Sequence, residues 1–84
     1  MTNREKWLRR LLSGDTAGWR FEDLRKAARY AGILSIPPRG GGSHWRFRVH
    51  GLPPVTVPRR TGHVLPIYVV KIRELAEEVL DGKA

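Results

Sequence analysis

The sequence predicts a small α+β fold in which helices cover one face of a three-stranded antiparallel sheet. The segments follow the order helix, helix, three short β segments and helix. Because short turns join the β segments, each should pair with its neighbour along the chain. The chain has 84 residues, enough for one modest core. Two helices packed on the sheet would form that core and leave the other face free for a ligand.

Apolar residues at helical spacing predict three helices. The first, over residues 5–12, is so short that it must pack on something to be stable. The second, over residues 21–31, has acidic residues first and basic residues later, as suits the helix dipole, and it stops at Gly32. The third starts near Pro66 or Ile67 and ends at residue 80. The predicted buried stripes are Trp7, Leu8, Leu11 and Leu12; Phe21, Leu24, Ala28 and Ala31; and Val69, Ile72, Leu75, Ala76 and Val79.

Prolines and glycines bound the three β segments, predicted over residues 33–36, 44–50 and 55–57. In the middle segment, basic and apolar residues alternate with the period of two that a strand requires. Trp45 and Phe47 are interpreted as core residues, with base stacking as the alternative. Trp7 and Trp19 are expected to anchor the N-terminal segment. On the predicted middle strand, one face carries His44, Arg46, Arg48 and His50, and the other carries Trp45, Phe47 and Val49.

The charge distribution indicates a polyanionic partner. The net charge is +8, and residues 24–73 hold ten Lys and Arg and all three His without one Asp or Glu. Such a stretch fits a nucleic acid, an acidic protein or a membrane surface. The alternative is a solubilising surface, although ordinary solvated faces mix both signs. The absence of cysteine excludes disulfides and thiolate metal sites, and the lack of a long apolar run favours a cytoplasmic protein without membrane contact.

A glycine run leads directly into a histidine, as Gly40-Gly41-Gly42-Ser43-His44. The run precedes a strand and lacks a following Lys-Ser or Lys-Thr, so it is neither a Walker loop nor a dinucleotide fingerprint. A flexible hairpin loop is the alternative. Imidazole exchanges a proton near neutral pH, so His44 is a candidate general acid or base, although a lone strand histidine is more often structural or merely exposed. The arginines expected to hold phosphate and stabilise developing negative charge are Arg39, Arg46, Arg48, Arg59 and Arg60.

No metal or other cofactor is expected. Mg²⁺ and Ca²⁺ need oxygen ligands, which the acid-free stretch lacks. His44 and His50 are roughly 20 Å apart along an extended chain, too far to share one ion. Cleavage of RNA could then use the 2′-hydroxyl as the nucleophile. Whether His50 or His63 assists is left open.

The stretch from residue 21 to residue 79 resembles the HicA toxins of prokaryotic toxin–antitoxin pairs. The resemblance is carried by residues 24–32, Gly42-Ser43-His44, Val55-Thr56-Val57-Pro58 and residues 65–75. It implies a double-stranded-RNA-binding-domain-like α-β-β-β-α fold over residues 21–81, preceded by an N-terminal extension, residues 1–20, with a short helix.

The resemblance also implies a function. It implies an endoribonuclease that cuts mRNA, with His44 as the catalytic residue and Gly42 and Ser43 as its setting. A HicB-like antitoxin would neutralise it, and DNA would be contacted only through the antitoxin complex. Two alternatives remain: a non-catalytic RNA- or DNA-binding module of the same fold, and an adaptor that meets an acidic protein.

Overall fold

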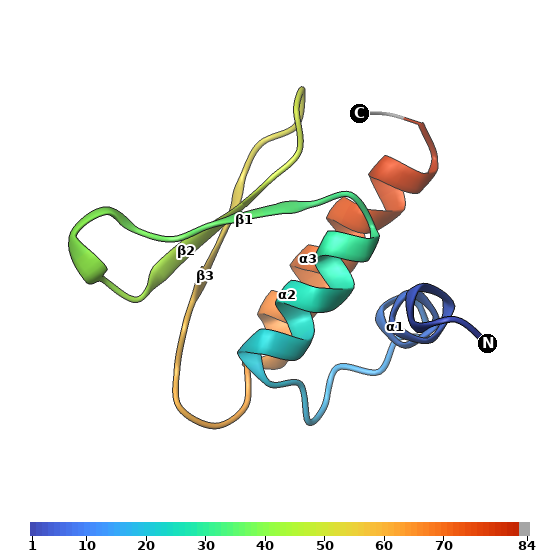
Figure 1. Ribbon diagram of the computed structural model, residues 1–84, viewed down its shortest axis with the longest axis horizontal. Helices are drawn as coiled ribbons and strands as arrows, with labels where there is room; N and C mark the ends of the chain where they lie inside the picture. The colour runs from blue at the N-terminus through green and yellow to red at the C-terminus, as the bar shows by residue number, and fades with distance from the viewer. Residues whose placement is uncertain (83–84) are drawn as a thin grey trace.

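The computed structural model describes residues 1–82, which form three α-helices and one three-stranded antiparallel sheet (Figure 1). The predicted α+β class is therefore confirmed. None of the helices in these residues is long and apolar enough to span a membrane. The elements are α1 (Asn3–Leu12), α2 (Phe21–Tyr30), β1 (Leu34–Ile36), a 3₁₀ turn (Arg39–Gly41), β2 (His44–Arg48), β3 (Val55–Pro58) and α3 (Pro66–Leu80).

Local signals in the sequence set the helix ends. At the start of α1 the Thr2 hydroxyl accepts a hydrogen bond from the Glu5 amide at 3.1 Å, and the Glu5 carboxylate accepts one from the Thr2 amide at 3.4 Å. This capping box starts the helix at Asn3, two residues before the predicted start. Gly32, with a φ of +85°, follows α2 where the sequence predicts the stop.

The sheet has the order β1-β2-β3, and its register determines which side chains share a face. Phe47 pairs with Ser35 on one side and with Val55 on the other, and Trp45 pairs with Val57. Residues directly opposite each other point to the same side. Phe47 and Val57 are fully buried, and they belong to the face against which α2 and α3 pack (Figure 1). This is the inner face of the sheet.

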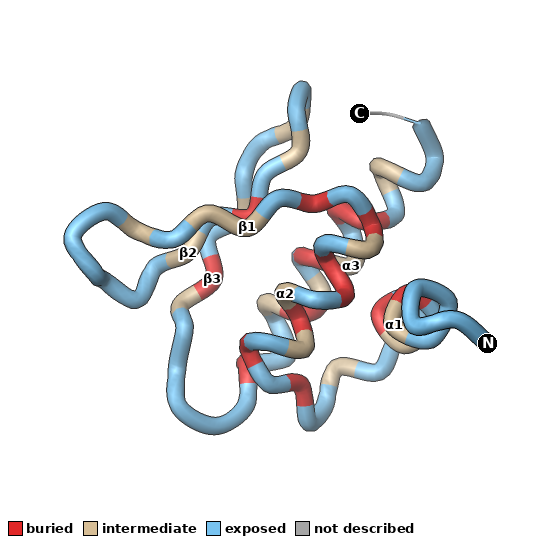
Figure 2. Tube along the Cα trace, viewed as in Figure 1, coloured by how far each residue is buried: buried red, intermediate tan, exposed pale blue. Residues whose placement is uncertain are grey.

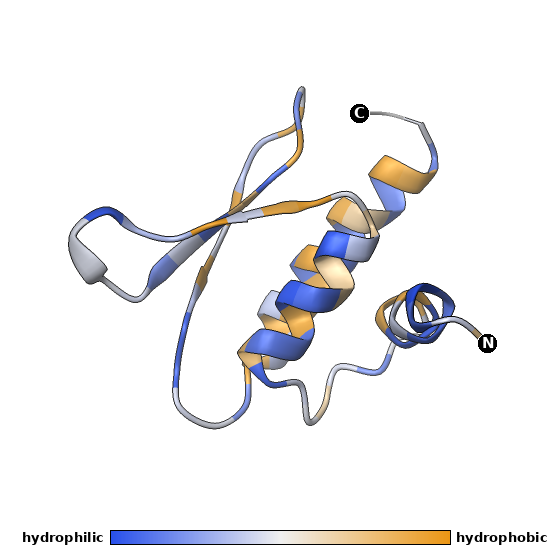
Figure 3. Ribbon diagram, viewed as in Figure 1, coloured by the Kyte–Doolittle hydropathy of each residue, from blue (hydrophilic) through white to orange (hydrophobic). Residues whose placement is uncertain are grey.

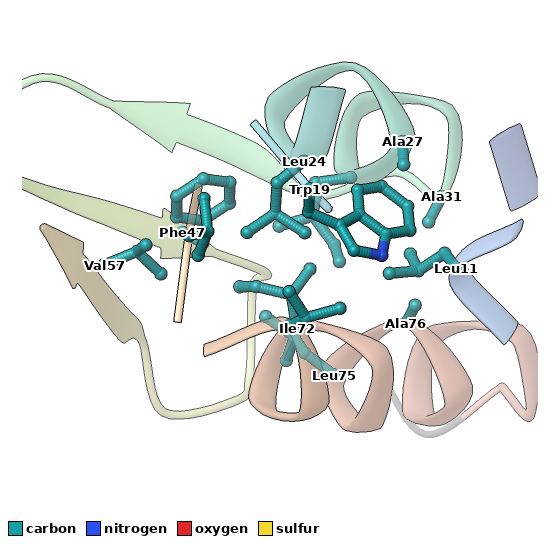
Figure 4. Packing of buried hydrophobic residues seen from close by; sticks show 14 of the residues in the cluster. Leu11, Trp19, Leu24, Ala27, Ala31, Phe47, Val57, Ile72, Leu75 and Ala76 are labelled. Atoms are coloured by element: carbon teal, nitrogen blue, oxygen red, sulfur yellow. The ribbon is translucent and has the colours of Figure 1, made fainter. Parts of the chain in front are cut away.

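One core joins the helices to the inner face (Figure 2, Figure 4). Its largest member is Trp19, which lies between α1 and α2 and donates a hydrogen bond from its indole nitrogen to the Asp15 carbonyl at 2.7 Å. Leu8 and Leu11 of α1 belong to the same core. Residues 1–20, expected as an extension, thus supply part of the hydrophobic centre, and both Trp7 and Trp19 pack there as predicted.

The predicted end of the middle strand and the predicted burial of Leu12 were wrong. The strand predicted over 44–50 ends at Arg48, because the chain turns at Gly51, whose φ is +85°, and the Leu52 amide bonds the Val49 carbonyl. His50 therefore lies in the turn and not on a strand face with His44. Leu12, predicted in the buried stripe, is 38% exposed because it is the last residue of α1, one step past the side that faces the core.

Leu11 and Leu12 form a matched pair that tests whether α1 is integral to the fold. Leu11→Ala should lower the free energy of unfolding by about 2–5 kcal/mol, because it leaves a cavity in the core. Leu12→Ala should change it by less than about 0.5 kcal/mol. Urea unfolding measures both values. Equal effects of the two substitutions would show that α1 is not part of the cooperative core.

Candidate nucleic-acid interface

The sheet face that points away from the helices, here called the outer face, carries the candidate histidine. Arg46 lies between Ile36 of β1 and Thr56 of β3, and His44 pairs with Pro58. His44, Arg46 and Arg48 are all exposed, while Phe47 between them is buried, so the predicted alternation of β2 is confirmed over residues 44–48. The outer face comprises Leu34, Ile36, His44, Arg46, Arg48, Thr56 and Pro58.

A shallow hollow of about 560 Å³ lies on the outer face. Arg39, from the 3₁₀ turn after β1, reaches the same hollow as the β2 side chains. Three arginines and one histidine thus line the same hollow as several apolar residues. Its lining residues are Ile36, Pro37, Pro38, Arg39, His44, Arg46, Arg48 and Thr56. The two prolines and Thr56 were not predicted as site residues, because only the strand register brings them beside His44.

The glycine run folds the β1–β2 connection back so that His44 starts its strand next to Pro38 and Arg39 (Figure 1). Gly40 and Gly41 have φ values of +74° and +81°, in the left-handed region that favours glycine. Gly42 has a φ of −71°, and a Cβ placed on it would only touch Pro38 at 3.7 Å. The backbone thus requires glycine at the first two positions, whereas it tolerates a side chain at residue 42.

Ser43 is fixed through its backbone. Its carbonyl accepts a hydrogen bond from the Arg59 amide at 2.6 Å, which continues the β2–β3 pairing one step past His44. The Ser43 residue itself is exposed. The prediction named Gly42 and Ser43 as the setting of His44. The structure places a backbone anchor at Ser43 and the tight turn at Gly40 and Gly41.

Arg59 lies on the other side of the sheet. Because Pro58 is on the outer face, the next residue alternates inward. The Arg59 guanidinium carbon is 5.5 Å from the Phe21 ring centroid and 5.8 Å from that of Trp45, and Nη2 is 3.4 Å from a carboxylate oxygen of Glu22. Arg59 therefore does not join Arg39, Arg46 and Arg48, although the sequence predicted all four as phosphate ligands.

A cluster behind His44 holds the start of β2 against α2. The Arg25 guanidinium carbon lies 4.7 Å from the Trp45 ring centroid, and Nη1 is 2.9 Å from Glu22. Arg25 also donates a hydrogen bond from Nε to the Ser35 hydroxyl at 3.1 Å. Trp45 is half-buried on the inner face, as the core interpretation predicted. The Glu22 cluster comprises Phe21, Glu22, Arg25, Trp45 and Arg59.

The remaining predicted candidates lie elsewhere. Arg60 is exposed in the loop after β3 and lines a separate hollow of about 520 Å³ with Arg20 and Asp23. His63 pairs with Arg20 through an isolated backbone bridge before α3. Within residues 1–82, no three His, Asp or Glu side chains gather in a group that could hold a metal ion.

The outer face combines a group able to move protons with groups able to hold phosphate. A guanidinium keeps its charge and presents several N–H donors to an oxyanion. Imidazole both donates and accepts protons near neutral pH. Comparison of the chain with protein families, with curated proteins and with solved structures gives no match.

Proposed function

We propose that this protein is a metal-independent endoribonuclease that cuts mRNA and inhibits translation, as the toxin of a HicA-type toxin–antitoxin pair. One observation carries the proposal: His44 is exposed at a hollow that it shares with Arg39, Arg46 and Arg48. None of the described residues that form the outer face carries a carboxylate, so none of them offsets the charge of these arginines. Such a surface attracts a polyanion and places an imidazole beside its phosphates.

The element order supports the proposed fold family. The order α2-β1-β2-β3-α3, with both helices on the inner face, is the order that the HicA resemblance implies for residues 21–81. We assign this part to the double-stranded-RNA-binding-domain-like fold on that basis. The helix α1 precedes residues 21–81 in the chain, and its buried side chains join the core that those residues form.

The proposed chemistry is a transesterification within the RNA strand. The 2′-oxygen attacks the adjacent phosphorus, the bond from phosphorus to the 5′-oxygen breaks, and the products are a 2′,3′-cyclic phosphate and a 5′-hydroxyl. One proton leaves the 2′-hydroxyl and one is delivered to the 5′-oxygen. His44 performs one of these transfers and water exchanges the other proton. The arginines stabilise the extra negative charge on the phosphate in the transition state.

The proposed partners follow from the same face. A HicB-like antitoxin would neutralise the protein by covering the hollow, and it would therefore need carboxylate or apolar groups that match Arg39, Arg46 and Arg48. Contact with DNA would come only through that complex. We propose a cytoplasmic location, because mRNA is the substrate.

A non-catalytic RNA-binding module is the second candidate, and one observation favours it. Among the described residues of the outer face, His44 is the only one with an imidazole, and none carries a carboxylate that could serve as a second acid or base. Binding needs only the arginines, whereas efficient cleavage benefits from two proton-transfer groups. Cleavage assays separate the two candidates.

The first prediction compares two exposed histidines. His44→Ala should lower the rate of RNA cleavage by about 10²–10⁴-fold, because it removes the proton-transfer group. His50→Ala is the matched control, since His50 is exposed in the β2–β3 turn, and it should cleave at the wild-type rate. Gel analysis of a labelled RNA measures both rates. A His44→Ala protein that cleaves as fast as wild type would refute the catalytic assignment.

A second prediction concerns the nucleophile. An RNA with a single 2′-deoxynucleotide on the 5′ side of the cleaved bond should stay intact at that bond, because the attacking oxygen is missing. Mass spectrometry of the products of the all-ribose control RNA, which is cut at that bond, should find a 2′,3′-cyclic phosphate. EDTA should leave the rate unchanged. Loss of activity in EDTA would argue for a metal-dependent reaction instead.

A third prediction tests the arginines of the outer face. Arg46→Ala should reduce the slope of log affinity against log salt by about 0.7, the value for one phosphate contact on a single strand. Lys71→Ala removes the same charge from an exposed position on α3 and should leave the slope unchanged. Fluorescence anisotropy with a labelled RNA measures the slopes. Identical slopes for the two variants would show that the outer face does not bind the backbone.

A further inference from the structure

A second group of cations surrounds Trp7, where α1 packs against α2. The Lys6 ammonium of α1 is 5.9 Å from the Trp7 ring centroid, and the Lys26 ammonium of α2 is 5.2 Å from it. The Arg10 guanidinium carbon is 5.9 Å from the same centroid. Lys6 and Lys26 are exposed, and Trp7 is half-buried. Helix packing has thus brought cations from two helices onto one aromatic ring.

The charges of this group are only partly balanced. Arg10 lies 3.5 Å from Asp15 and 4.0 Å from Asp23. Within residues 1–82, neither Lys6 nor Lys26 has a carboxylate oxygen within 4.0 Å. The carboxylates nearest in sequence are engaged elsewhere: Glu5 in the α1 cap, Glu22 with two arginines and Asp23 with Arg10.

The cation–π contacts around Trp7 contribute little to the stability of the fold. An exposed cation–π contact contributes about 0.5–1 kcal/mol. The two ammonium groups lie within about 11 Å of each other, because both are near the same centroid, and their repulsion offsets part of that gain. A bound anion between them would remove the repulsion.

We propose that Lys6, Trp7 and Lys26 form a second contact for single-stranded RNA, separate from the outer face. The two ammonium groups bind backbone phosphates, and the exposed part of the indole contacts a base. The choice of RNA as the polyanion rests on the proposed function. A membrane surface fits less well, because Leu8 and Leu11 of α1 are buried and its exposed side is charged (Figure 3).

The position of α1 gives this contact a distinct role. The helix lies on the side of α2 and α3 away from the sheet (Figure 1). RNA held there is remote from His44, so the contact lengthens the footprint on the strand and raises affinity without taking part in the chemistry.

The test measures binding to a fully 2′-O-methylated oligonucleotide, which cannot be cleaved through its 2′-oxygen. The double variant Lys6→Gln/Lys26→Gln removes two positive charges but keeps polar side chains at the surface. It should reduce the slope of log affinity against log salt by about 1.4, the value for two contacts on a single strand. Lys6→Arg/Lys26→Arg should keep the wild-type slope. Lys71→Glu changes the net charge by the same amount at an unrelated position on α3, and its slope should also stay at the wild-type value.

An unchanged slope in the Gln variant would overturn the inference. An equal reduction in Lys71→Glu would overturn it too, because it would reveal a general charge effect. A Gln variant that melts at a lower temperature with an unchanged slope would assign the lysines to folding alone. Vesicles containing phosphatidylserine serve as the competing anion, and charge-dependent binding to vesicles but not to RNA would also refute the assignment.

A separate variant tests the proposed contact between the Trp7 indole and a base. Trp7→Leu should weaken binding of RNA by about fivefold, the low end of the range for one stacked base, and should leave binding of an abasic strand with the same phosphates unchanged. Equal losses on both strands would reject the base contact. None of these measurements depends on cleavage. A His44→Ala protein that still cuts RNA would therefore refute the catalytic proposal without affecting this one.

Discussion

The burial of Phe47 is the constraint on which the rest of the sheet depends. This ring is fully buried on the inner face, 6.1 Å from the Phe21 ring of α2. Successive side chains of a strand point to opposite faces, so fixing Phe47 inward forces Arg46 and Arg48 outward. A register shift of one residue would place both guanidinium groups in the core, at a cost in desolvation that no carboxylate on the neighbouring strands could offset. The outer face is thus a consequence of core packing.

The Glu22 cluster engages some arginines in packing, whereas those of the outer face stay unpaired with carboxylates of residues 1–82. On the inner side, one carboxylate contacts both Arg25 and Arg59, and the guanidinium groups cover the Trp45 ring. These ion pairs are half-exposed and individually weak, but together they tie the start of β2 and the end of β3 to α2. On the outer face, no carboxylate of residues 1–82 pairs with Arg39, Arg46 or Arg48. A phosphate approaching the sheet therefore meets free guanidinium groups on one face only.

The sequence was sufficient for the fold class and for the alternation of β2, because both follow from local periodicity. It failed where the outcome depends on register or on packing between elements. His50 has the right spacing to share a face with His44, but the strand ends two residues earlier, at Arg48. The inward direction of Arg59 depends on the pairing of Pro58 with His44, which spacing along the chain does not specify. The approach of Lys26 to Trp7 likewise requires α1 to pack on α2.

Acidic residues give the molecule one negatively charged end. Four of them, Glu74, Glu77, Glu78 and Asp81, line a hollow of about 820 Å³ with Leu12 and Leu80 at the C-terminal end of α3. This negative end belongs to the helix layer, whereas the outer face is cationic. A polyanion approaching the protein is attracted to the sheet side and repelled from the end of α3, and this field orients the encounter before any contact forms. The α1–α2 cations around Trp7 form a second positive region on the helix side. In the binding mode proposed above, a strand that reaches both regions would pass around the molecule, away from the acidic end.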